Sequence, residues 1–196
     1  MKRNRTTTLL TVLAMAAFSG AMLRAIAPGG QDTPRTAPQK SRVERGAYLV
    51  TMMGCNDCHT PWKIGPQGPE PDMTRALTGH PSDMPVPPPP PASGPWIGHI
   101  LATNTAWAGP WGVSFTANLT PDKETGLGSW TEEMFIATMR TARHQGKGRP
   151  ILPPMPVKMI GKANDEDLKS IFAYLQSLKP VRNKVPAPID PPEEKR

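Results

Sequence analysis

The sequence predicts a mostly α-helical domain of about three to four helices, interrupted by a long proline-rich loop. Three observations lead to this fold class. Apolar residues recur at helical spacing in three separate segments, no long alternating strand pattern is present, and prolines are dense between the first two helical segments. Only 37% of the 196 residues are hydrophobic, so a core made of protein side chains alone would be thin.

The N-terminus has the layout of a secretory signal peptide. Basic residues at positions 2, 3 and 5 precede an apolar run from about residue 8 to 23, and small residues lead to Ala27. Residues 1–27 are therefore interpreted as an export signal or, because the apolar run is long, as a retained N-terminal membrane anchor. A Pro/Gly/polar linker is expected at 28–40, and the protein is expected in the periplasm.

Three segments are predicted to be helical. They cover residues 41–53, about 131–143 and about 164–178. Gly46 in the first segment is expected to permit close approach by another helix, because glycine is otherwise unfavourable inside a helix. Ser129 and Glu132 have the spacing of a capping box before the second segment, and Asn164 is expected to cap the third.

The proline-rich insert at residues 62–117 is predicted to lack helices and strands. It includes five consecutive prolines at 87–91, and proline removes backbone donors and fixes one dihedral angle. Tryptophans in its second half favour an ordered loop packed on the helical domain, whereas a disordered low-complexity insert is the alternative. Residues 181–196 are predicted to form a charged, proline-rich tail that is frayed.

The motif that carries chemistry is Cys-Asn-Asp-Cys-His at residues 55–59. Two thiols at this spacing can form thioether bonds to the two vinyl groups of one haem, and the histidine that follows is placed to bind the iron. Cys55 and Cys58 are the two cysteines of the sequence, so one covalent haem c is predicted, with His59 as an axial ligand. A redox dithiol would call for a βαβ context, and a zinc site for two further ligands at short spacing.

Met155 is the predicted second axial ligand. It lies in the sequence Pro-Pro-Met-Pro at 153–156, where prolines can hold the thioether on a stiff loop just before the last helix. Weaker alternatives are Met159 and the three other histidines, His80, His99 and His144.

These segments resemble class I cytochromes c: SRVERGAYLV leads into GCNDCHTP, LPPMP presents a methionine, and NDEDLKSIFAYLQSLKP follows. The segment NLTPDKETGLGSWTEEMF is also similar to haem domains in cytochrome subunits of periplasmic alcohol and sugar-acid dehydrogenases. The resemblance covers about residues 41–61 and 112–185 and implies a cytochrome c domain over 41–180. It also implies groups that contact haem propionates or the haem rim. The candidates by residue type are Trp130, Arg140 and Arg149.

The expected function is single-electron transfer between redox partners, and the chain is not expected to be an enzyme itself. The resemblance implies a dehydrogenase or a larger cytochrome as partner. The alternative is a haem enzyme or gas sensor with an open sixth coordination site, similar to a peroxidase. The formal charge is +7, but four basic residues lie in the export segment, which leaves 23 − 4 = 19 basic against 16 acidic residues. Because these are scattered, nucleic-acid binding is not supported.

Overall fold

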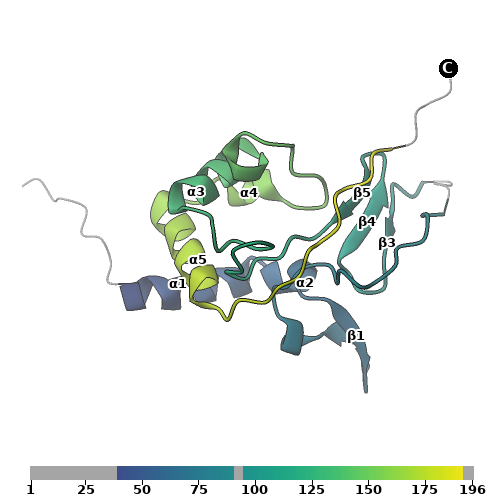
Figure 1. Cartoon of the computed structure of the whole chain (residues 1–196), viewed down its shortest axis with the longest axis horizontal. Coiled ribbons are helices and arrows are strands. Elements are labelled where there is room, and N and C mark those ends of the chain that lie inside the picture. Colours follow the sequence, from purple (N-terminus) through teal and green to yellow (C-terminus); the bar gives the residue numbers. More distant parts are fainter. Residues whose placement is uncertain (1–38, 91–94, 192–196) are drawn as a thin grey trace, which may run out of the picture. The chain divides into compact units, whose positions relative to one another are not determined.

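The computed structural model describes residues 39–90 and 95–191 (Figure 1). The expected signal or anchor at 1–27 and almost all of the linker at 28–40 lie outside these residues. Its helices are α1 (Gln39–Met52), α2 (Cys55–His59), α3 (Glu132–Thr141), α4 (Val157–Ile160) and α5 (Asp165–Ser177), with 3-10 turns η1 (Met73–Arg75) and η2 (His144–Gly146). Its strands are β1 (Trp62–Gly65), β2 (Gly68–Pro71), β3 (His99–Ile100), β4 (Ala106–Gly109) and β5 (Gly112–Phe115). Within the described ranges, no helix has the length and apolar character needed to cross a membrane.

The helical core is built on the packing of α1 against α5 (Figure 1). Leu49 and Val50 of α1 are buried in one cluster with Leu168, Ile171 and Leu175 of α5. Burying side chains of this size stabilises the fold by about 1.5–3 kcal/mol each.

Gly46 lies where the two helices come closest. A Cβ atom at this position would overlap the carbonyl oxygen of Ser170 and lie 2.7 Å from Cβ of Tyr174. The expectation that Gly46 permits close helix approach is confirmed, and the reason is that any side chain here would collide with the backbone of α5.

The predicted caps had different outcomes. Asn164 caps α5, because its Oδ1 accepts a 2.7 Å hydrogen bond from the backbone N–H of Asp167. The predicted capping box of Ser129 and Glu132 is wrong. The cap of α3 is Thr131, whose Oγ1 accepts from the N–H of Met134 over 3.2 Å, since only the residue directly before the first turn can reach that donor.

The expectation of a mostly α-helical fold is wrong. Three long helices do occur near the predicted positions, but the part of the chain described here also holds two antiparallel sheets. One sheet pairs β1 with β2, and the other has the order β3-β4-β5. All five strands lie in the segment 62–117, which was expected to be loop.

The strands escaped notice because each has only two to four residues, too few to show an alternating pattern. Two of the prolines, Pro66 and Pro110, lie in hairpin turns, and two others, Pro69 and Pro71, lie within β2 itself. The sequence Gly-Pro-x-Gly occurs at 65–68 and again at 109–112, and each time its two glycines pair across the end of a hairpin. Gly68 and Gly112 have φ angles of 116° and 89°, which glycine adopts without strain.

The C-terminal segment crosses from α5 to the second sheet (yellow in Figure 1). Ile189 and Val113 of β5 exchange two backbone hydrogen bonds of 2.9 and 2.8 Å. Asn183 donates from Nδ2 to the carbonyls of Thr78 and His80 over 2.7 and 2.8 Å. The expectation of a frayed tail is therefore wrong for residues 181–191, because side-chain amides and strand pairing tie this part to the insert.

Candidate functional site

A cavity of about 520 Å³ lies between the helical core and the second sheet. Its walls come from α2, β5, the loop at 116–119, α3, the segment 149–156 and α5. Apolar side chains such as Phe135, Ile171 and Leu175 form much of the lining. The volume lies within the range of roughly 300–1,000 Å³ that is usual for cofactor and small-molecule pockets.

Helix α2 places the Cys-Asn-Asp-Cys-His motif on the wall of this cavity. Gly54, with φ 67° and ψ 27°, turns the chain between α1 and α2. Cys55, Cys58 and His59 all line the cavity. Burial raises the pKa of the Cys55 thiol to about 11, and burial also raises the pKa of Cys58. Both groups stay protonated at neutral pH, which argues against a reactive dithiol, since such sites depend on a low thiol pKa.

The ring of His59 is held in one orientation. The side chain is buried, and Nδ1 lies 2.8 Å from the carbonyl oxygen of Ala117. A carbonyl only accepts hydrogen bonds, so Nδ1 carries the hydrogen and Nε2 keeps its lone pair. Burial lowers the pKa of His59, and the bond to Ala117 raises it less. A neutral imidazole whose other nitrogen is held by a backbone carbonyl is the usual form of a metal-binding histidine.

Met155 also lines the cavity, from the loop before α4. Ser114 of β5 donates from Oγ to the carbonyl oxygen of Pro153 over 2.6 Å and so connects this loop to the sheet. Met159, the alternative methionine, lies on α4 with 73% of its surface exposed and does not line the cavity.

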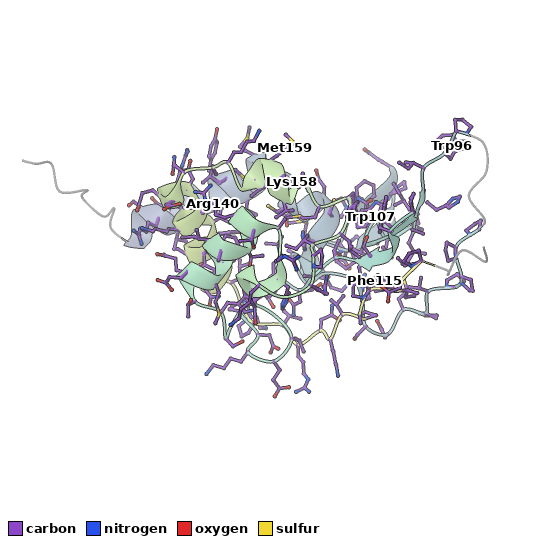
Figure 2. The ribbon with its side chains drawn as sticks, turned by 90° about the horizontal axis from the view of Figure 1, so that it is seen from above. Trp96, Trp107, Phe115, Arg140, Lys158 and Met159 are labelled. Atoms are coloured by element: carbon purple, nitrogen blue, oxygen red, sulfur yellow. The ribbon has the colours of Figure 1, made fainter. Side chains whose placement is uncertain are left out.

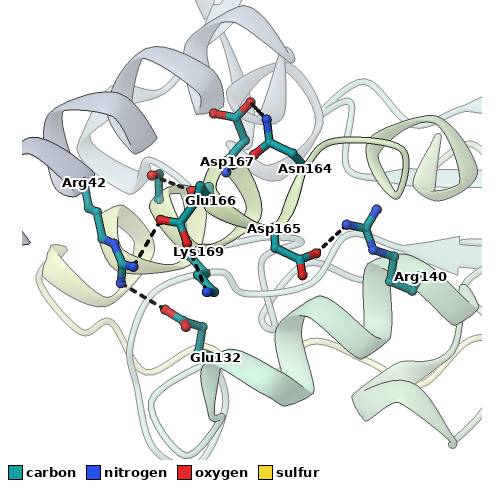
Figure 3. Close-up of polar contacts among 9 residues, drawn as sticks. Arg42, Glu132, Arg140, Asn164, Asp165, Glu166, Asp167 and Lys169 are labelled. Carbon is teal, nitrogen blue, oxygen red and sulfur yellow. Dashed lines mark hydrogen bonds and ion pairs between the residues drawn. The ribbon is translucent and has the colours of Figure 1, made fainter. Parts of the chain in front are cut away.

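The remaining predicted contacts divide into two groups. Trp130 and Arg149 line the cavity. Arg140 does not, because its guanidinium donates to the carbonyl of Gly161 and, over 2.6 Å, to Oδ1 of Asp165. Figure 3 shows the contact with Asp165.

The three other histidines lie in different places. His144 lines the cavity and packs edge-on against Trp130, with ring centroids 5.0 Å apart. His80 is fully buried against Phe115, at a centroid separation of 5.0 Å, and His99 lies on β3. Neither His80 nor His99 lines the cavity.

Sequence reasoning missed three contributors to the site. The carbonyl of Ala117 orients His59, Ser114 supports the Met155 loop, and Pro188 of the C-terminal segment lines the cavity. The role of a backbone carbonyl cannot be predicted from residue type, because every residue has one. The Gly-Pro-x-Gly turn at 109–112, by contrast, was a readable signal for the hairpin that carries Ser114.

The residues gathered here suit a covalently attached haem. Two thiols lie on the same wall as an imidazole with a free lone pair, and a thioether is presented from another segment. Imidazole and thioether together are a common ligand pair for haem iron, and the apolar lining suits a porphyrin.

Comparison with known proteins points to the same chemistry. The chain is 28% identical over 176 residues, 89% of its length, to the fructose dehydrogenase cytochrome subunit of Gluconobacter japonicus, of which this covers 28%. It is 26% identical over 147 residues to the cytochrome c subunit of the quinone alcohol dehydrogenase of Gluconobacter oxydans, covering 74% of this chain and 23% of that one. It is 37% identical over 90 residues to a nicotinate dehydrogenase subunit of Pseudomonas putida, covering 46% of this chain and 8% of that one.

The chain thus spans less than a third of the length of these relatives. No family model matches the sequence. The similarity nevertheless agrees with the residue-level resemblance, because both show that the chain is similar to cytochrome subunits of dehydrogenases.

Proposed function

We infer that this chain is a monohaem c-type cytochrome that carries single electrons between redox partners. The observation that carries the proposal is the Cys-Asn-Asp-Cys-His helix on the wall of a cavity of about 520 Å³, with His59 held by the carbonyl of Ala117. When bound, haem c supplies one-electron exchange between Fe(III) and Fe(II). A single C-x-x-C-H motif in the sequence supports one haem per chain.

Different residues of the chain would attach the haem, ligate its iron and contact its edge. Cys55 and Cys58 would attach it covalently, while His59 Nε2 and the sulfur of Met155 would be the axial ligands. Trp130 and Arg149, on the cavity wall, would serve its propionates or rim. The apolar side chains of the lining would keep water from the bound haem, which would lower the local dielectric constant and so help to tune the reduction potential.

The proposed setting is the periplasm, with a dehydrogenase or a larger cytochrome as partner. Two findings support this: the export-like sequence at residues 1–27, and the names of the relatives, which are subunits of fructose, alcohol and nicotinate dehydrogenases. In this role the partner performs substrate oxidation and the present chain relays electrons. A retained N-terminal anchor would keep it at the membrane surface.

Optical spectra of the purified holoprotein, oxidised and reduced, with and without carbon monoxide, test the ligand set. We expect a weak far-red methionine-to-Fe(III) band and no carbon monoxide binding. Met155→Ala should abolish the band and admit carbon monoxide, whereas Met159→Ala, the exposed neighbour, should leave both unchanged. A high-spin wild-type spectrum with ready carbon monoxide binding would contradict the proposal and favour an open-site haem enzyme or gas sensor.

Intact-mass spectra test the attachment. The wild-type chain should carry the added mass of one haem that survives acid–acetone extraction. Cys55→Ser and Cys58→Ser should each leave at most one thioether bond, and the double variant should lose the haem on extraction. The same spectra report whether the N-terminal segment has been removed.

A further inference from the structure

The proline-rich insert contains a long stretch without charge. From residue 84 to 121 the sequence has no Asp, Glu, Lys or Arg, whereas these four residue types make up 20% of the whole chain. The stretch includes all three strands of the second sheet. A surface made from these residues offers no charged group that would attract or repel a partner, so its contacts depend on apolar side chains.

Several apolar side chains of this stretch are exposed. Trp96, Ile97 and Ile100 expose 73%, 73% and 64% of their surface. The prolines at 87–90 are exposed as well. Because proline has no backbone N–H, these four positions carry no donor that would have to give up water on contact with an apolar surface. Trp96, Ile97, Ile100 and the prolines at 87–90 are called the insert face below.

A groove of about 100 Å³ lies at the insert face. Its lining includes the prolines at 87–90 and Ile100, together with Ala106, Ala108 and Val113 of β4 and β5. The groove is therefore formed where the proline run meets the second sheet. Exposed apolar surface of this kind, next to a groove, is typical of a site where another molecule binds.

Trp107 connects this groove with the proposed haem site. Among the residues that the structure describes, it alone lines both the groove and the cavity of about 520 Å³. Its side chain is buried, with 8% of its surface exposed. Figure 2 shows Trp107 between Trp96 and the helices that carry Arg140 and Met159. Electronic coupling decays more slowly through packed atoms than across empty space, so this indole provides a short path from the cavity to the insert face.

The chemistry of the insert face limits what can cover it. A charged protein surface would lose hydration there and gain no ion pair. Hydrocarbon of a bilayer fits poorly, because β3 pairs only with β4 among the described strands, and lipid cannot satisfy the backbone groups of an open sheet edge. A second copy of this chain would have the same reduction potential, so an electron passed to it would bring no net change. An uncharged, apolar patch on a different redox protein meets all three conditions.

We propose that the insert face is a docking site for a redox protein that presents an uncharged, apolar patch, and that Trp107 couples this face to the haem site. This proposal rests on the proposed function, because it assigns a place where electrons enter or leave the same site. Each event passes one electron between the reduced and the oxidised partner, and no bond is made or broken. Trp107 acts by its position and is not itself oxidised.

The first test uses a gold electrode with a methyl-terminated monolayer as a stand-in for the apolar patch, and measures adsorption of the holoprotein by voltammetry. The face variant is Trp96→Ser with Ile97→Ser. The matched control is Ile64→Ser with Met73→Ser, which removes two apolar side chains that are 79% and 60% exposed and line neither the groove nor the cavity.

We expect the face variant to bind this monolayer about tenfold more weakly than the wild type, because exposed tryptophan is often a main contributor to binding. The control should bind like the wild type. Wild-type binding should persist in about 1 M salt, where ion pairs are screened. On a carboxylate-terminated monolayer the two variants should bind equally, since they have the same charge.

The second test measures the rate of electron exchange with the same methyl-terminated electrode. Trp107→Leu should leave the adsorbed amount unchanged and slow the exchange severalfold, whereas Trp107→Phe, which keeps an aromatic ring, should retain most of the rate. Val113→Ala removes buried apolar atoms that line the groove but not the cavity, so it controls for a loosened sheet and should not slow the exchange. An unchanged reduction potential in each variant shows that the haem site is intact. Equal rates for Trp107→Leu and Val113→Ala would overturn the role of Trp107.

The outcomes separate the two proposals. Equal adsorption of the face and control variants would overturn the docking site and leave the electron carrier intact. Two further results would overturn a redox protein as the occupant. Sedimentation with phosphatidylcholine vesicles that the face variant lacks would identify a membrane contact, and a dimer in analytical ultracentrifugation that the face variant lacks would identify a second copy. Absence of any one-electron wave in wild-type protein, even with soluble mediators, would overturn the proposed function itself.

Discussion

Ser114 Oγ donates to the carbonyl oxygen of Pro153 over 2.6 Å, and this bond joins the second sheet to the loop that presents Met155. The insert is thus connected directly to the cavity wall. Ser114→Ala should remove this bond and leave a partly buried carbonyl without its partner, at a cost of about 1 kcal/mol. The loop would then hold the methionine less firmly.

The far-red methionine band, followed during heating, measures this effect. For a domain of this size the midpoint for loss of the band should fall by about 2–4 °C. Ser114→Thr, which keeps a hydroxyl, should recover part of the shift. Ser177→Ala, which removes a hydroxyl bonded to Tyr174 at the end of α5, serves as the control. In this variant the band should be lost at the same temperature as the fold as a whole. An equal fall of this midpoint in both alanine variants would mean that Ser114 does not specifically hold the loop of Met155.

Gly46→Ala tests the contact between α1 and α5. In an ordinary helix this change stabilises by about 0.5–1 kcal/mol. Here the added Cβ would overlap the carbonyl of Ser170, so we expect destabilisation by roughly 1–3 kcal/mol or more. Urea unfolding followed by far-UV circular dichroism gives the sign directly. Glu44→Ala, at an exposed position of the same helix, should change stability by less than about 0.5 kcal/mol.

Asn183→Ala tests the anchoring of the C-terminal segment. The amide donates to the carbonyls of Thr78 and His80 and accepts from the N–H of Ser82 over 3.0 Å. Its loss should destabilise the protein by about 1–3 kcal/mol, because three backbone groups lose their partner. We expect faster hydrogen exchange at Ile189 and Val113, whose mutual pairing depends on the segment remaining in place.

Lys184→Ala is the control for this measurement, since Lys184 is the exposed next residue. Unchanged exchange at Ile189 in the Asn183 variant would show that the strand pairing holds the segment without help from the amide. Acceleration in both variants would point to a general loosening of the tail.

The long helices were predictable because each spans several turns and carries an apolar face, as Leu168, Ile171 and Leu175 do on α5. The sheets were not, because four residues such as Ala106–Gly109 are too few to show a period. The density of prolines then suggested a loop, although Pro66 and Pro110 lie in the turns that connect the strands and do not interrupt them.

The residues of the candidate site were also only partly predictable from the sequence. Cys55, Cys58 and His59 could be named from their spacing, and Met155 from the prolines that flank it just before the last helix; the structure brings all four to one cavity. The partners that position them could not be named, since the carbonyl of Ala117 belongs to the backbone and Ser114 acts across 39 residues of sequence. Arg140 had the right chemistry for a propionate contact but forms an ion pair with Asp165. Residue type alone does not settle such competition between partners.

At the start of α3, variants of Ser129 and Thr131 distinguish the capping box expected from the sequence from the cap seen in the structure. Thr131→Ala removes the acceptor for the N–H of Met134 and should destabilise the protein by about 1 kcal/mol. Ser129→Ala should change stability by less than about 0.5 kcal/mol, because Ser129 is exposed and lies two residues before the cap. Thr131→Ser, which keeps the hydroxyl, should retain most of the stability. Chemical denaturation of the four proteins under identical conditions gives the comparison, and a larger loss for Ser129→Ala than for Thr131→Ala would restore the capping box.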